Sequence, residues 1–186
     1  AFTGCTRKQR IQCIKALSSF FPVRDHRLHV FHKSVKDFFI DPERADELLY
    51  VDVKEVHQRM GKQCMKMDAK YGIEHCIEHL YEAGEMELVK QQVFDWEWLK
   101  KRATVSIHGL LHDLKMVKDK MIGLVHGACS MSLDILAKDL SQLGIQISGR
   151  LLAHMHHPEI KELVDRIRKD IGWYPSWQTM EQAGGA

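Results

Sequence analysis

The sequence predicts a mainly α-helical fold, in which a small N-terminal segment with one strand precedes an antiparallel helical superhelix or bundle. The 186 residues include four prolines, and none of these lies between Pro42 and Pro158. Helix-compatible residues dominate that span, and glycines are its main interruptions. Apolar residues recur there at spacings of three and four, the period of an amphipathic helix. Such short helices favour an array in which each pair covers the apolar face of the next.

The N-terminal segment is expected to contain two helices separated by a strand. Thr6 is a suitable cap for a helix that ends before Pro22. A basic turn follows, and residues 28–32 alternate as in a strand. Ser34 is expected to cap a second helix, which ends near residue 41. The order helix, turn, strand, helix is compatible with the back half of a winged helix.

The rest of the chain divides into helices wherever glycine, proline or a break in the apolar period intervenes. The expected helices span residues 45–67, 71–83, 85–92, 95–103, 106–120, 124–143, 149–154 and 158–171. Large aromatic and aliphatic side chains should anchor the core, namely Phe38, Phe39, Phe94, Trp96 or Trp98, and Leu99. The tail changes character, because it has aromatic residues, proline and glycine but no periodicity, and it is expected to be a linker.

Charge and hydropathy argue against two classes of partner. Lys and Arg total 27 against 25 for Asp and Glu, so the formal charge of +2 does not point to nucleic acid. Arg7, Lys8, Arg10 and Lys15 could face phosphates from the first helix, but a basic helix face is usually only solvated. No apolar run approaches the roughly 18 residues of a membrane-spanning helix, so no membrane partner is expected.

The number and spacing of the cysteines indicate the redox compartment of the protein. The five cysteines are widely and irregularly spaced and form no C-x-x-C pair, so neither a zinc ribbon nor a redox dithiol is predicted. Most of them are expected to be small buried hydrophobic residues in a reducing compartment. We therefore expect a cytoplasmic protein. The N-terminus lacks the apolar core of a signal peptide and is interpreted as a boundary within a longer polypeptide.

Two histidine clusters are candidates for metal or catalytic sites. His75 and His79 belong to an H-x-x-E-H string, and on a helix they share one face with zinc-ligand spacing while Glu78 could act as a base. A third ligand is needed and none is marked, so packing is the preferred interpretation and no metal is expected. His154, His156 and His157 precede Pro158 in what should be a solvated turn.

Other catalytic motifs are missing from the sequence. It contains no G-x-x-x-x-G-K-[ST], no G-x-G-x-x-G and no G-x-S-x-G. The chain is therefore not expected to be an enzyme or to build its own phosphate-binding loop.

His32 lies between a strand-like run and the first turn of a helix, in the stretch VFHKSVKDFF. Three roles compete for it. It could be a buried structural histidine, a metal or catalytic histidine, or a histidine that meets a ligand supplied from outside this chain.

Three segments resemble, in the same order, the NACHT class of STAND signalling NTPases, in particular those with a C-terminal WD40 propeller. Residues 31–39, FHKSVKDFF, resemble the end of the NACHT-associated winged helix. Residues 71–99, which contain HLYEAG and FDWEWL, resemble the helices that follow it. SQL at 141–143, GRLL at 149–152 and the GG at 184–185 resemble the passage before the first propeller blade.

The resemblance implies three parts. Residues 1–41 would be the C-terminal part of a winged-helix domain, 42–171 a helical domain, and 172–186 a linker toward a WD40 propeller. The chain would be a non-catalytic coupling segment that relays between an upstream NACHT nucleotide-binding domain and the downstream sensor repeats. It would hold no cofactor itself, whereas its parent would be an ATPase or GTPase switch that binds ADP or ATP with Mg²⁺ and is able to oligomerise.

The resemblance also implies a role for His32, which matches the winged-helix histidine that approaches the phosphate of bound ADP and latches the inactive state. An imidazole at the start of a helix can donate a hydrogen bond to a phosphate. The competing interpretation is a histidine satisfied by backbone groups where strand meets helix. The alternative function is a helical-repeat scaffold that holds a protein partner on its concave face, without any NTPase domain.

Overall fold

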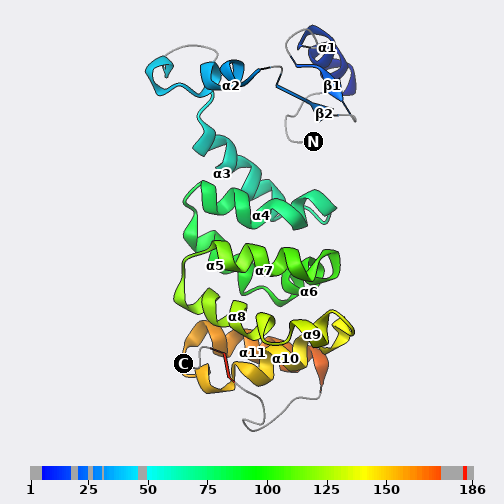
Figure 1. Cartoon of the computed structure of the whole chain (residues 1–186), viewed down its shortest axis with the longest axis vertical. Coiled ribbons are helices and arrows are strands. Elements are labelled where there is room, and N and C mark those ends of the chain that lie inside the picture. The colour runs from blue at the N-terminus through cyan, green and yellow to red at the C-terminus, as the bar shows by residue number, and fades with distance from the viewer. Residues whose placement is uncertain are drawn as a thin grey trace. The chain divides into compact units, whose positions relative to one another are not determined.

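The structure is a computed structural model that describes residues 6–17, 21–24, 27–30, 32–45, 50–172 and 182–183. Packing divides the chain into two compact units, residues 1–57 and residues 58–186, called here the N-terminal unit and the helical unit. Helices dominate the fold (Figure 1), which confirms the predicted mainly α class. The predicted division into residues 1–41, 42–171 and 172–186 stays a prediction.

The N-terminal unit contains two helices separated by a short hairpin. The elements are α1 (Arg7–Leu17), β1 (Val23–Arg24), β2 (Arg27–Leu28), α2 (Lys33–Ile40) and the 3₁₀ turn η1 (Pro42–Arg44). The predicted cap at Thr6 is confirmed, because its hydroxyl oxygen accepts a hydrogen bond from the Gln9 N–H at 3.3 Å. Gln9 Oε1 accepts in return from the Thr6 N–H at 2.8 Å. This reciprocal pair is a capping box and fixes where α1 begins.

The predicted strand over residues 28–32 is wrong beyond Leu28. β1 and β2 pair antiparallel with Val23 opposite Leu28, so part of the predicted turn supplies the first strand. His29 and Val30 lie outside the ladder, and Phe31 lies outside the described residues. The His29 N–H donates instead to the Pro22 carbonyl at 3.0 Å, just beyond the hairpin. Alternation of apolar and polar residues gives no information about a pairing partner, so the prediction missed the hairpin.

The helical unit is a stack of short helices. The division between the two units falls within the residue range of α3 (Val53–Cys64). The remaining elements are α4 (Lys70–Glu82), α5 (Met86–Val93), α6 (Trp96–Val105), α7 (Ile107–Met116), α8 (Lys120–Ser130), α9 (Leu133–Leu136), η2 (Leu140–Gln142), α10 (Leu143–Arg150), η3 (Leu152–His154) and α11 (Pro158–Ile171). Successive helices form successive layers, with α4, α7, α8 and the α10–α11 pair following one another along the unit (Figure 1).

Several predicted helix boundaries are wrong because polar side chains start and stop helices locally. The helix expected over 106–120 ends at Met116, since Asp119 caps the next helix by accepting from the N–H groups of Met121 and Ile122. The single helix expected over 124–143 is broken into α8, α9, η2 and the start of α10. In that stretch Asp139 caps η2 by accepting from the Ser141 N–H at 3.0 Å. Side chains of this kind compete with the helix backbone for hydrogen bonds.

Two other expected helices also differ. The helix expected over 45–67 begins only at Val53, and that expected over 149–154 is replaced by the end of α10 followed by η3. The remaining expected helices agree with α4, α5, α6 and α11 to within about two residues.

The core belongs to the helical unit. Trp96 and Trp98 are both buried and Leu99 is fully buried, as predicted. Phe94 and Phe39 are only half-buried, and the prediction of a buried Phe38 is wrong because that ring is 40% exposed. Among the described residues from 6 to 57, none is buried. The described apolar side chains of the N-terminal unit are therefore exposed or half-buried, whereas the helical unit encloses a core of its own.

Cysteine burial agrees with the sequence for three of the described cysteines. Cys64, Cys76 and Cys129 are buried, Cys13 is exposed, and Cys5 lies outside the described residues. Burial raises the pKa of the Cys76 thiol to about 12, and nearby Cys64 and Asp113 act in the same direction. Among the described helices, none combines the length and the apolar character that crossing a membrane requires.

A glycine allows α3 and α4 to approach closely. A Cβ at Gly61 would lie 2.6 Å from Leu80 Cδ2 and 3.1 Å from the Leu80 backbone nitrogen. Leu80 is fully buried, and its backbone is held within α4, so it cannot move away easily. Gly123 in α8 offers the contrast, because nothing lies within 4 Å of the Cβ position there.

We expect Gly61→Ala to lower the free energy of unfolding by about 1–3 kcal/mol, the usual cost of overpacking. Gly123→Ala is the matched control and should raise that free energy by up to about 1 kcal/mol, because alanine favours the helix over glycine. Urea unfolding followed by circular dichroism measures both. Equal midpoints for the two variants would contradict the close packing of α3 on α4.

Candidate functional site

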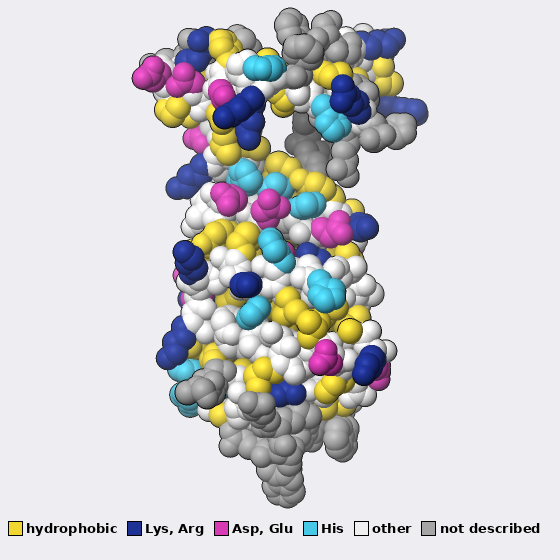
Figure 2. Space-filling model, viewed as in Figure 1, with side chains coloured by type: hydrophobic (Ala, Val, Ile, Leu, Met, Phe, Trp, Pro, Cys, Tyr) yellow, Lys and Arg dark blue, Asp and Glu magenta, His cyan; other side chains and the backbone are white. Residues whose placement is uncertain are grey.

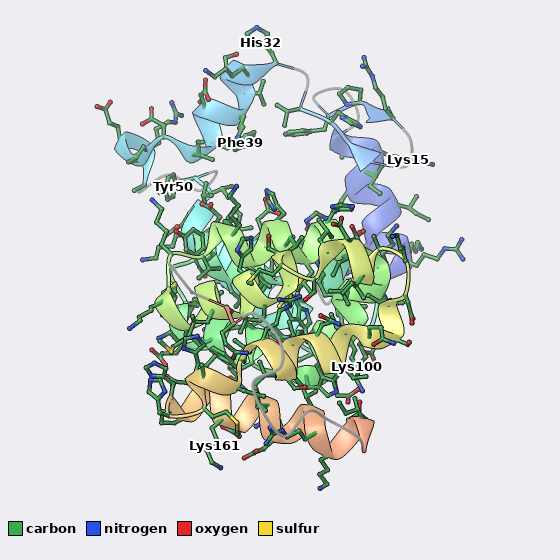
Figure 3. The ribbon with its side chains drawn as sticks, turned by 60° about the horizontal axis from the view of Figure 1, so that its bottom comes forward. Lys15, His32, Phe39, Tyr50, Lys100 and Lys161 are labelled. Carbon is green, nitrogen blue, oxygen red and sulfur yellow. The ribbon has the colours of Figure 1, made fainter. Side chains whose placement is uncertain are left out.

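His32 is the N-cap residue of α2. Its backbone is extended, with φ −148° and ψ 148°, and its Nδ1 accepts a hydrogen bond from the Ser34 N–H at 3.2 Å. Ser34 Oγ lies 2.8 Å from the same nitrogen. The expected cap at Ser34 is therefore wrong by two residues, because the imidazole itself satisfies an N–H of the first turn. The side chain is exposed and lies at the N-terminal end of the helix (Figure 3).

The capping contact decides which ring nitrogen can act as a donor. A ring nitrogen that accepts a hydrogen bond cannot carry the proton of the neutral imidazole, so the proton lies on Nε2. Nδ1 of His32 is therefore satisfied by the backbone, as one interpretation predicted, and Nε2–H is a donor on an exposed ring. No buried structural role applies.

The surroundings of His32 favour an anion. The first turn of α2 contains no acidic residue, and Lys33 and Lys36 are exposed beside the imidazole in sequence. A helix N-terminus carries a partial positive charge and N–H groups without intrahelical partners, so anions are stabilised there. Behind this end, Phe39 packs against Phe21 and Phe38, with ring centroids 6.1 and 5.6 Å apart. These rings hold α2 within the N-terminal unit.

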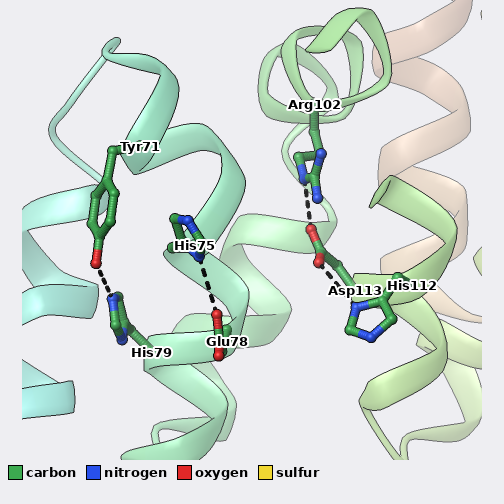
Figure 4. A network of polar contacts seen from close by, with 7 residues as sticks. All are labelled: Tyr71, His75, Glu78, His79, Arg102, His112 and Asp113. Carbon is green, nitrogen blue, oxygen red and sulfur yellow. Dashed lines mark hydrogen bonds and ion pairs between the residues drawn. The ribbon is translucent and has the colours of Figure 1, made fainter. Parts of the chain in front are cut away.

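The H-x-x-E-H string lies on α4, as predicted, but its two imidazoles have separate partners (Figure 4). His75 Nδ1 lies 3.1 Å from Glu78 Oε2, and His79 Nε2 lies 2.9 Å from the Tyr71 hydroxyl. The two imidazole centroids are 6.2 Å apart, and the Tyr71 ring lies 4.5 Å from that of His75. Within the described part of the chain, no group of three or more His, Cys, Asp or Glu side chains could hold a metal ion.

A groove of about 410 Å³ passes beside this cluster, between α4 and α7. Glu74, His75 and Glu78 line it from α4, and Ser106, Gly109, His112 and Asp113 line it from the α6–α7 side, together with Arg102. Histidines are visible along this part of the surface of the helical unit (Figure 2). The groove is thus polar and mixed in charge.

A buried ion pair forms the floor of the groove. Arg102 Nε donates to Asp113 Oδ2 at 2.6 Å, and the two side chains are 6% and 7% exposed. Burial raises the pKa of the Asp113 carboxyl, while Arg102 and His112 oppose that shift. Gly109 makes room for the guanidinium, because a Cβ there would lie 2.4 Å from both terminal nitrogens. The pair ties α6 to α7 and is structural in character.

The other candidate residues are spread over the surface. Arg7, Lys8 and Lys15 are exposed on α1, and the Arg10 side chain lies outside the described residues. His154, His156 and His157 follow α10, where the His156 and His157 rings are 4.1 Å apart. His154 is not simply solvated, because its Nε2 contacts the Ala183 carbonyl. The structure thus corrects the expectation of a plain solvated turn.

Comparisons with protein-family models, curated proteins and solved structures gave no match for this chain.

Sequence reasoning missed the Arg102–Asp113 pair and the residues around Gln182. Arg102 and Asp113 lie on different helices, so their pairing leaves no periodic signal. A charged residue on an apolar helix face is a usable signal, since buried charges need partners. Nothing local distinguishes Gln182 from a linker residue.

Asp113→Ala should lower the free energy of unfolding by about 3–5 kcal/mol, because it leaves the Arg102 guanidinium buried without its counter-charge. Replacing both partners, by Arg102→Met and Asp113→Leu together, should recover most of that loss. The control is Asp165→Ala, which breaks the exposed pair with Lys161 and should cost at most about 1 kcal/mol. Chemical unfolding compares the three. A decrease in the free energy of unfolding that is no larger for Asp113→Ala than for the control would contradict a stabilising role of this ion pair.

Proposed function

We propose that this chain is a non-catalytic coupling segment of a NACHT-type, nucleotide-dependent signalling switch, in which it relays between a nucleotide-binding domain and downstream WD40 sensor repeats. The observation that carries the proposal is the exposed His32 imidazole, which caps α2 through Nδ1 and presents a protonated Nε2. A phosphate of ADP bound in the neighbouring domain would accept from that Nε2–H. The chain itself performs no chemistry on this proposal.

Exposure of the N-terminal unit supports the same proposal. Ile11, Ile14, Val30 and Phe38 are each at least 40% exposed. Burial of apolar surface is the main stabilising contribution to folding, and none of the described residues from 6 to 57 is buried, so these residues contribute little of that stabilisation by themselves. A neighbouring domain that covers these side chains would supply the missing stabilisation by apolar burial. Half of a winged helix would need such cover.

The helical unit supports the relay part of the proposal. Its core is continuous from α4 to α11 and includes fully buried Leu99, Leu110, Ile147 and Leu163. A close-packed body of this kind moves as a unit and transmits a displacement from one end to the other. A scaffold for a protein partner would need the same rigidity. The role of His32 and the reading frame therefore distinguish the coupling segment from the scaffold.

The reading frame gives the first check. A Walker A motif encoded upstream and Trp-Asp repeats encoded downstream are expected on the proposed function. A frame without either would favour the scaffold.

His32→Leu in the polypeptide that joins this chain to its nucleotide-binding domain should speed ADP release. Losing one hydrogen bond to a charged group costs about 1.5–3 kcal/mol, which corresponds to about 10–100-fold faster release. Release of a fluorescent ADP analogue in stopped flow measures the rate, and basal oligomerisation should rise with it.

Two variants separate the phosphate contact from the helix cap. His32→Asn keeps a side-chain acceptor suitable for an N-cap, so α2 should remain capped while the phosphate contact is lost, and release should accelerate. His29→Leu, on an exposed histidine outside α2, should leave release unchanged. Unchanged release in both His32 variants would overturn the proposed role of this residue.

A further inference from the structure

The last described residues, Gln182 and Ala183, are bound to the end of α10. The Ala183 N–H donates to the Arg150 carbonyl at 2.9 Å, and Gln182 Nε2 donates to the Gly149 carbonyl at 3.0 Å. Carbonyls in the last turn of a helix lack intrahelical partners, so these two are available acceptors. Residues about 30 positions away in sequence thus satisfy the end of α10.

The adjoining turn, η3, supplies the complementary donors. The Ala153 N–H donates to Gln182 Oε1 at 3.0 Å, and His154 Nε2 contacts the Ala183 carbonyl at 2.5 Å. Because a carbonyl oxygen only accepts, His154 must carry a proton on Nε2 in this contact. Both polar ends of the Gln182 carboxamide are bonded, and so are the backbone N–H and C=O of Ala183.

These contacts select for particular residues. A carboxamide carries an acceptor and a donor at one end, which matches the Ala153 N–H and the Gly149 carbonyl. A glutamate would lack the donor. The Ala183 side chain is fully buried and belongs to the same core as the helices, so a larger side chain would not fit there.

The helices that hold Gln182 and Ala183 are complete without these two residues. α11 covers the core with Ile160, Leu163, Val164 and Ile167, all fully buried, and ends at Gly172 in the left-handed conformation with φ 69°. The tail is therefore not needed to complete α11. Residues 173–181, which join α11 to the docked pair, lie outside the described residues.

We propose that the end of α10 together with η3 is a peptide-docking site for a glutamine followed by a small residue, and that Gln182 and Ala183 of the same chain fill it. Recognition comes from helix-end carbonyls, one backbone N–H and one histidine. The site stands independently of the proposed function. Only its consequence rests on that function: a docked tail fixes the point at which the polypeptide leaves the helical unit, so sensor repeats beyond it would be coupled rigidly.

The site can be tested with the chain alone and no nucleotide. In the emptied chain, Gln182→Ala and Ala183→Asp are combined, and the probe is a fluorescent peptide of residues 179–186, TMEQAGGA. Fluorescence anisotropy should show binding to the emptied chain and at least tenfold weaker binding to the intact chain, because the tethered tail competes at a high effective concentration. A peptide with glutamate in place of the glutamine should bind at least tenfold more weakly than the probe.

Two further variants guard against a folding artefact. Gln182→Glu in the intact chain keeps the side-chain size and should raise amide hydrogen exchange of Ala153 and Ala183 at least tenfold, at an unchanged circular dichroism spectrum. Gln142→Ala is the matched control, since Gln142 donates to Asp139 and has no hydrogen bond to the described tail residues Gln182 and Ala183. Both amides should keep their protection in this variant.

The docking proposal is overturned if the emptied chain binds no probe, or if Gln182→Glu leaves the exchange of both amides unchanged. Neither outcome bears on His32, because no nucleotide is involved. Conversely, a failure of the ADP-release experiment leaves the docking site standing.

Discussion

Short helices are stable in water only when their apolar faces are covered, and the two units of this chain meet that constraint differently. In the helical unit each helix covers its neighbour, so Leu80, Leu99 and Leu110 lose all contact with solvent. The close approach this requires depends on glycines such as Gly61, where even a methyl group would collide with the next helix. The N-terminal unit has the same kinds of helix but no buried residue among those described.

This difference in burial gives the proposed function its physical basis. A domain with a close-packed core keeps its shape when it moves. A unit whose described apolar side chains are exposed or half-buried gains stability when a binding partner covers them. On the proposed function, the N-terminal unit would respond to a neighbouring domain, and the helical unit would stay rigid. His32 would add a specific contact to that neighbour, because its capping bond to Ser34 orients the ring and sets the position of its proton.

The sequence predicted the parts of the structure that depend on local pattern. The period of the apolar residues placed α4, α5, α6 and α11 closely, and Thr6 as an expected cap marked the start of α1. It failed where a boundary depends on one polar side chain, as at Asp119, or on a partner distant in sequence, as for the hairpin. Phe38 was expected in the core because of its size, yet whether an aromatic residue is buried depends on what lies opposite it. The sequence pattern marked His32 as a candidate, but its capping bond and tautomer depend on the position of the Ser34 N–H, which no sequence pattern gives.

The contacts of the tail residues Gln182 and Ala183 with α10 could not be predicted from amino-acid composition. Glycine, proline and the lack of a period made residues 172–186 look like a linker, and such residues carry no internal signal for docking. The indication of docking lies in α10, because the backbone carbonyls of its last turn have no hydrogen-bond donors within the helix. Any helix end enclosed by neighbouring segments must find donors from elsewhere in the chain. Here Gln182 and Ala183 supply them, and in doing so they bury the Ala183 methyl in the core, which polar capping by water could not achieve. Gln182 and Ala183 are therefore held against the helical unit by both backbone and side-chain contacts.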